Sequence, residues 1–173
     1  NEPWKGKSYA KLYNSKGDQV FRKKKKKTIF FTPDSRYLVL NKAGKKAESL
    51  VLYSISKKES TKRDSVVSFR LLPDWGNWIA VKGKDSVLTI LDLSTGMERK
   101  FTGVADYLPA KRGKSVLIKT KNQLVYAQIE SNKTIELSNA KKTDKMSISA
   151  DGLNVAWISG GELRLKSDGT ESR

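Results

Sequence analysis

The chain has 173 residues, a formal net charge of +17, and neither histidine nor cysteine. Without these residue types it has no thiolate nucleophile, no histidine general base and no cysteine or histidine metal ligand, which excludes the usual hydrolase triads and zinc sites for this chain. No apolar run approaches the roughly 18 residues of a membrane span, and no segment resembles a signal peptide.

The first predicted element is a pair of strands at residues 9–13 and 18–21, joined by the polar turn at 14–17. It has the pattern of the outer half of a four-stranded sheet, without the two inner strands before it. A run of cations follows at residues 22–27. Like-charge runs are commonly solvated connectors, and we favour that interpretation.

From residue 28 onward a unit recurs: an apolar strand, a turn built on Pro and Asp, a second apolar strand, and a third strand that ends in a polar turn. The steps from Pro33 to Pro73, Pro109 and Ala150 are 40, 36 and 41 residues. This spacing suits a four-stranded propeller blade of about 40 to 45 residues. The predicted strands lie near residues 28–32, 37–40, 50–55, 66–71, 78–81, 87–93, 115–119, 123–129, 145–149, 154–158 and 162–166.

These elements predict an all-β chain of about four and a half β-propeller blades. We expect a half blade at residues 8–21 and blades at about 27–63, 64–102, 103–138 and 143–173. Because an open sheet edge invites pairing, we also expect a longer natural chain that supplies the inner strands for residues 9–21.

The Pro-Asp turns have a structural interpretation. Pro sets φ at the first corner, Asp bonds to the backbone two residues on, and Gly tolerates positive φ. The residues assigned to these turns are Pro33, Asp34, Pro73, Asp74, Pro109, Asp151 and Gly152. The acidic ones occupy equivalent turns, so we expect them to be distributed over the blades without converging on a calcium ion.

The apolar-x-Pro-Asp-Gly/Ser turn, together with the strand end Asp92-Leu93-Ser94-Thr95-Gly96, resembles the WD40-like "PD40" propeller repeat. That repeat occurs in propellers of the TolB and tricorn type and in prolyl-oligopeptidase-type serine peptidases. Two residues depart from it: Trp75 follows the second Pro-Asp, and Ala110 replaces the third Asp.

In prolyl-oligopeptidase-type enzymes the propeller precedes a separate α/β-hydrolase domain that carries the Ser, Asp and His. This chain has no Gly-x-Ser-x-Gly elbow and no His. The resemblance therefore implies a non-catalytic module without a cofactor, which binds protein or peptide and controls access to a catalytic domain outside this chain. A free-standing TolB-like scaffold is the alternative, and the resemblance implies a periplasmic or secreted bacterial protein.

Two sets of residues are candidates for binding. Trp75, in a blade-end turn, is expected to be partly exposed as an aromatic contact, and packing beside Trp78 is the favoured alternative. The other set is Lys23, Lys24, Lys25, Lys26 and Lys27.

The lysine run leaves a polyanion-binding module as a second alternative. Residues 1–86 hold 21 Lys and Arg against 8 Asp and Glu, whereas residues 87–173 hold 14 against 10. Non-specific polyanion attraction at low salt is expected from this charge. However, no nucleic-acid motif accompanies it, and alternation assigns the nearby Phe21, Phe30 and Phe31 to strand cores.

Overall fold

The computed structural model describes residues 9–24, 28–42, 48–139, 143–167 and 170–172. All regular structure in these ranges is β-strand, apart from one 3-10 turn at Pro73–Trp75. The predicted all-β fold is confirmed. The chain forms two compact units, Asn1–Ser68 and Phe69–Arg173. None of the described segments is a helix that could cross a membrane.

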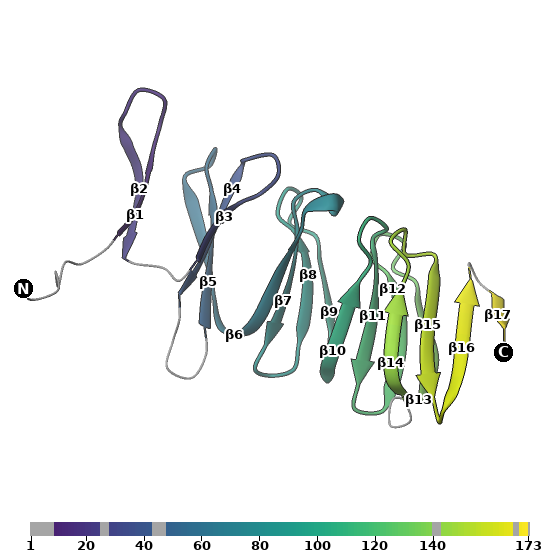
Figure 1. Cartoon of the computed structure of the whole chain (residues 1–173). Helices are drawn as coiled ribbons and strands as arrows, with labels where there is room; N and C mark the ends of the chain where they lie inside the picture. The colour runs from purple at the N-terminus through teal and green to yellow at the C-terminus, as the bar shows by residue number, and fades with distance from the viewer. Residues whose placement is uncertain (1–8, 25–27, 43–47, 140–142, 168–169, 173) are drawn as a thin grey trace, which may run out of the picture. The chain divides into compact units, whose positions relative to one another are not determined.

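The first unit contains a two-stranded and a larger antiparallel sheet (Figure 1). β1 pairs with β2, and β3 to β6 pair in chain order. Phe21 of β2 packs against Tyr53 of β5 with ring centroids 4.4 Å apart. The strands are β1 (Tyr9–Tyr13), β2 (Gln19–Lys24), β3 (Thr28–Phe31), β4 (Tyr37–Lys42), β5 (Glu48–Ser54) and β6 (Glu59–Leu72).

Strand β6 is longer than the sequence predicts. A strand was expected at residues 66–71, but β6 runs for 14 residues, pairing with β5 in its first part and with β7 in its last. Its register against β5 shifts close to Ser65, which has a φ of +58°. Because hydrogen bonding links β3 to β9 as one seven-stranded sheet, the division into blades stays a prediction.

The second unit consists of antiparallel meanders (Figure 1). β10 to β13 form one four-stranded sheet and β14 to β17 another. The strands that begin in this unit are β7 (Trp78–Gly83), β8 (Leu88–Asp92), β9 (Glu98–Phe101), β10 (Val104–Pro109), β11 (Ser115–Thr120), β12 (Gln123–Gln128), β13 (Thr134–Asn139), β14 (Thr143–Ile148), β15 (Asn154–Ser159), β16 (Glu162–Ser167) and β17 (Thr170–Ser172).

The β10–β13 sheet is buried on both faces. Val116 and Ile118 pack in one core with Trp78 and Ile90 of the strands before it. Their neighbour Leu117 points the other way, into a core with Trp157 of β15. Successive side chains of a strand alternate between faces, so a continuous apolar run such as residues 116–118 belongs to a sheet covered on both sides.

The assignment of Phe30 and Phe31 to a strand core is wrong. Phe21 is buried, but Phe30 and Phe31 are 42% and 50% exposed. They lie on β3, the edge strand of its sheet, and the core with Phe21 is built on β4 and β5. Among the described residues, only β1 and β2 belong to the neighbouring sheet of this unit.

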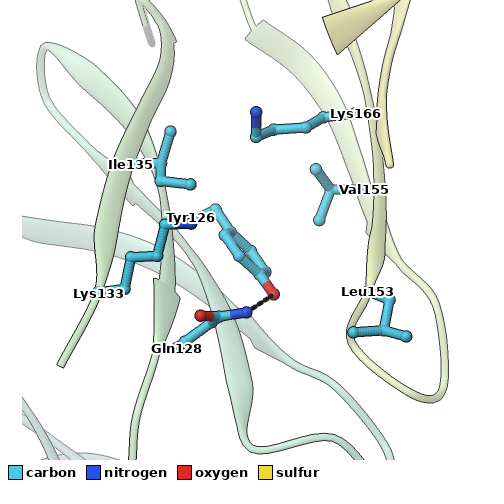
Figure 2. A pocket seen from close by; sticks show the side chains of 7 residues that line it. All are labelled: Tyr126, Gln128, Lys133, Ile135, Leu153, Val155 and Lys166. Carbon is cyan, nitrogen blue, oxygen red and sulfur yellow. Dashed lines mark hydrogen bonds between the residues drawn. The ribbon is translucent and has the colours of Figure 1, made fainter. Parts of the chain in front are cut away.

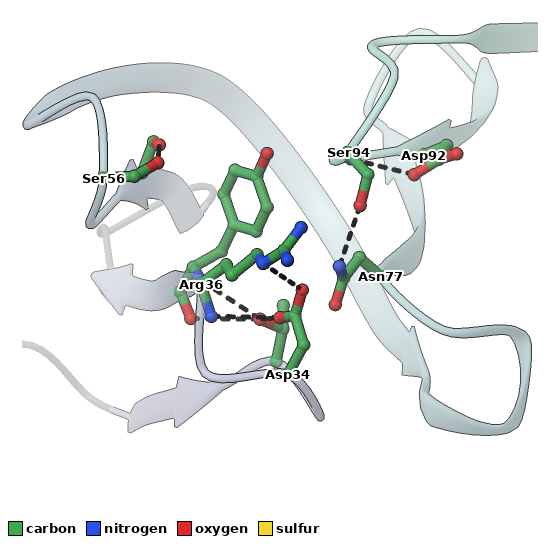
Figure 3. A network of polar contacts seen from close by, with 9 residues as sticks. Asp34, Arg36, Ser56, Asn77, Asp92 and Ser94 are labelled. Atoms are coloured by element: carbon green, nitrogen blue, oxygen red, sulfur yellow. Dashed lines mark hydrogen bonds and ion pairs between the residues drawn. The ribbon is translucent and has the colours of Figure 1, made fainter.

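Two of the Pro-Asp-type turns have the same hydrogen-bond pattern. Thr32 Oγ1 donates to Asp34 Oδ1 (2.8 Å), Arg36 N donates to the same oxygen (3.0 Å), and Tyr37 N donates to Thr32 Oγ1 (3.1 Å). Figure 3 shows this turn of the first unit at Asp34 and Arg36.

In the second unit, Ser149 Oγ donates to Asp151 Oδ1, Leu153 N donates to that oxygen (3.0 Å), and Asn154 N donates to Ser149 Oγ (2.9 Å). In both turns a hydroxyl two residues before the Asp, from Thr32 or Ser149, closes the turn. The sequence pattern alone did not predict this role.

Trp75 and Ala110, the two residues that depart from the repeat, form a hydrogen bond with each other. Trp75 Nε1 donates a hydrogen bond of 3.0 Å to the carbonyl oxygen of Ala110 in the turn of the next sheet. Trp75 is only 4% exposed and meets Trp78 edge-on at 6.2 Å, so the expected exposure of Trp75 is wrong and packing beside Trp78 is confirmed. Ala110 is 2% exposed, so the Asp of the repeat would be buried at this position, which is unfavourable for a charge.

We predict that Trp75→Phe destabilises the protein by about 1 to 3 kcal/mol more than Trp157→Phe. Both indoles are buried in the same unit, but no hydrogen-bond partner of Trp157 Nε1 lies among the described residues. Both variants lose similar volume, and only Trp75→Phe leaves the Ala110 carbonyl without its donor. Urea unfolding followed by circular dichroism measures the difference. Equal losses would contradict the assigned hydrogen bond.

A second prediction concerns pH. The hydroxyl of Ser149, and then the Leu153 N–H, lower the pKa of the exposed Asp151 carboxyl. A carboxyl with a lowered pKa adds stability above its ordinary pKa, and this contribution is lost as pH falls through the lowered value. Asp151→Ala should therefore reduce the unfolding free energy at pH 7, and the difference from the unsubstituted chain should shrink below about pH 4.

Ser149→Ala is the control for this experiment, because it keeps the carboxyl and removes its main donor. It should reproduce most of the pH-dependent loss. A difference that stays constant from pH 7 to pH 2 would show that the Asp151 turn adds no charge-dependent stability.

Candidate functional site

The second unit contains a groove of about 480 Å³. It runs across strands that begin their sheets: β10 contributes residues 106–108 and β14 contributes residues 143–146. Arg70 of β6 and Lys119 of β11 complete the lining. β14 contacts both β10 and β11, so the groove crosses from one sheet to the next.

A β-bulge at the start of each of these strands positions the lining. The register of β10 against β11 shifts between Val104 and Asp106, and that of β14 against β15 shifts between Thr143 and Lys145. Val104 and Thr143 are buried beside the bulges. A bulge bends its strand and redirects the following side chains, which places Asp106 and Asp144 at the groove.

A lysine of β7 and a lysine of β11 donate hydrogen bonds to backbone carbonyls at these bulges. Lys119 Nζ donates to the Thr143 carbonyl at 2.5 Å, and Lys82 Nζ donates to the Ala105 carbonyl. Sequence analysis missed this pair. Lys82 and Lys119 both follow a run of four buried residues at the same position of the repeat, and that recurrence was the available signal.

The groove is mixed in charge and partly apolar. Arg70, Lys119 and Lys145 supply cations, and Asp106 and Asp144 supply carboxylates. Asp106 Oδ1 accepts from the Tyr107 backbone N–H at 2.8 Å, which orients that carboxylate. Such a surface can bind an extended chain through both signs of charge, with apolar contacts from Tyr107, Leu108 and Met146.

Within the described ranges, no three His, Cys, Asp or Glu residues come together as metal ligands. The sequence contains no histidine at all.

Of the candidate binding residues, Trp75 is described in full and does not line the groove. Trp75 is buried between turns. Lys23 and Lys24 end β2 but their side chains are not among those described, and Lys25, Lys26 and Lys27 lie outside the described residues.

The residues assigned to turns lie where strands meet. Pro33 and Asp34 lie between β3 and β4, Pro73 and Asp74 open the 3-10 turn, and Pro109 ends β10. Asp151 and Gly152 lie between β14 and β15. In the same second unit Asn77 Nδ2 donates to Ser94 Oγ at 2.8 Å, and Ser94 N donates to Asp92 Oδ1 at 2.8 Å (Figure 3).

No protein-family model matches the chain, and no curated protein sequence matches it. Solved structures do. The tricorn protease superposes with a TM-score of 0.54 and 11% identity over 82% of this chain and 16% of that chain. TolB from Acinetobacter baumannii matches with a TM-score of 0.47 and 16% identity over 95% of this chain and 47% of that one.

A functionally unknown protein from Desulfotomaculum acetoxidans gives a TM-score of 0.47 and 13% identity over 90% of this chain and 57% of its own. The chain thus spans 16% of the tricorn protease and about half of each of the other two proteins. At these identities the likeness concerns the fold alone, and the tricorn protease match is the one that carries the conclusion. Together with the antiparallel four-stranded sheets, it shows that this chain has the β-propeller fold that its repeat predicts.

Proposed function

We propose that this chain is a non-catalytic propeller module that binds an extended segment of a protein or peptide in the groove across β10 and β14. The groove carries this proposal, because three cations, two carboxylates and apolar side chains together line a volume of about 480 Å³. A peptide offers both charge signs and apolar side chains, so it can satisfy all of these groups together.

We further propose that the parent protein is a serine peptidase of the prolyl-oligopeptidase type, in which this module controls access to a separate catalytic domain. The repeat resemblance supports this. The chain also shares its fold with a stretch of a protease, since it spans 16% of the tricorn protease. In this proposal the chain supplies no reacting group, and the protein is periplasmic or secreted.

A free-standing TolB-like scaffold uses the same groove, and the two proposals differ outside this chain. In the full-length gene, a downstream Gly-x-Ser-x-Gly segment supports the peptidase. A polyanion-binding module is the other alternative, and it predicts affinity that falls steeply with salt for any polyanion.

We predict that decapeptides selected by phage display against the whole chain bind in this groove. Tyr107→Ala combined with Lys145→Glu should weaken the binding of a selected peptide at least tenfold, about 1.4 kcal/mol. Fluorescence anisotropy with a labelled peptide measures the dissociation constant. Incubation of the same peptide with the chain, followed by mass spectrometry, should show no cleavage.

Lys111→Glu is the matched control, because it makes the same charge change at an exposed turn away from the groove. It should leave peptide binding within about twofold. The proposal fails if no selected peptide binds with a dissociation constant below about 1 mM, or if Lys111→Glu weakens binding as much as the groove variant.

A further inference from the structure

A second, smaller cavity lies between the facing sides of the β10–β13 and β14–β17 sheets. Figure 2 shows its walls: Tyr126, Gln128, Lys133 and Ile135 from one sheet, and Leu153, Val155 and Lys166 on the side of the other. Its volume is about 40 Å³. It shares no lining residue with the groove.

The hydrogen bonds of Tyr126 determine which groups face this cavity. The Tyr126 hydroxyl lies 2.7 Å from the Gly152 carbonyl oxygen, which can only accept, so the tyrosine donates its one hydrogen there. Towards Gln128, 3.4 Å away, the hydroxyl can then only accept. The amide of Gln128 must therefore present its NH2 group to Tyr126, while its oxygen accepts from Ser131 Oγ at 3.1 Å.

The polar lining consists almost entirely of donors. An NH2 group has two hydrogens, and Tyr126 takes only one from Gln128. Lys133 and Lys166 add two ammonium groups, and no carboxylate is among the described side chains that line the cavity. In the register of β16 and β17, Glu171 lies opposite Lys166 and has the opposite charge. The experiment below therefore substitutes Lys133 and Gln128 and leaves Lys166 unchanged.

The size and walls of the cavity select the ligand. A cavity of about 10 to 15 Å³ holds one water, so 40 Å³ admits a small polar group such as a carboxylate. The walls beside the donors are apolar, from Ile135, Leu153 and Val155, and Leu153 is 46% exposed at the rim. An aliphatic stem attached to the carboxylate can pack there.

We propose that this cavity binds a carboxylate carried on a short aliphatic stem, as on an acidic side chain of a peptide. The ammonium group of Lys133 and the amide NH2 of Gln128 bind the two oxygens, and Lys166 adds positive charge from the facing sheet. Charge-assisted hydrogen bonds of this kind are stronger than neutral ones. The site is separate from the proposed peptide groove.

The test uses the whole chain and the peptide N-acetyl-Gly-Glu-Gly-amide. In a 15N–1H titration, the side-chain amide signal of Gln128 should shift saturably, with a dissociation constant in the millimolar range. The same peptide with Gln in place of Glu should give no saturable shift. Lys133→Met should weaken binding at least tenfold, and so should Gln128→Leu, which removes the donor without changing charge.

Lys121→Met controls for the net charge of the chain, since it removes the same charge from an exposed turn that does not line the cavity. It should leave the affinity within about twofold. Equal weakening by Lys121→Met and Lys133→Met would mean general attraction to a basic protein and would overturn the site.

Two small anions test whether the cavity prefers a carboxylate on an aliphatic stem over other anionic groups. Acetate should bind at the same signal but more weakly than the peptide, because it lacks the stem. Tighter binding of methyl phosphate than of the Glu peptide would overturn the carboxylate assignment. Loss of peptide binding in the groove variant with the Gln128 titration unchanged would show that the two sites are independent.

Discussion

The packing of each sheet against the face of the next is the interaction on which the second unit depends. An antiparallel sheet of four short strands cannot enclose a core by itself, so its apolar faces must be covered by neighbours. The β10–β13 sheet lies between two such neighbours, with Val116 and Ile118 on one side and Leu117 on the other. At about 25 cal/mol per Å² of apolar surface, burial of both faces is the main favourable contribution to its stability.

Hydrogen bonds to backbone carbonyls set the register between these packed faces, because apolar packing alone has little directionality. At the turn end, Trp75 donates to Ala110 O, and Arg112 N donates to Ala150 O at 2.6 Å. Near the other ends of the strands, Lys82 and Lys119 donate to carbonyls at the bulges of the following sheets. The turns are so close that a Cβ on Gly113 would lie 1.6 Å from the Asp151 carbonyl oxygen.

Both hollows of this unit arise at the limits of that packing. The groove forms where bulged first strands turn charged side chains away from the cores, and the small cavity forms where the facing sides of β12 and β15 leave a space beside Tyr126. The charged groups of both hollows come from positions outside the cores, whereas apolar lining residues such as Tyr126, Val155 and Met146 also pack in a core.

The amino-acid sequence by itself determined most of the strands, their turns and their order, but neither β10 nor the first part of β6. These features depend on neighbouring residues in the sequence. Apolar and polar residues alternate in segments such as residues 123–129, and a Pro or Asp stands at most corners. Only the tertiary structure decided which side chains are covered. Phe31 and Leu117 both lie in apolar strand segments, yet one is 50% exposed and the other buried, because the neighbouring sheets cover β11 and leave β3 open. Both hollows and the Trp75–Ala110 hydrogen bond could not be predicted from the sequence, because each joins residues of different sheets. No local sequence pattern indicates which sheets will pack together.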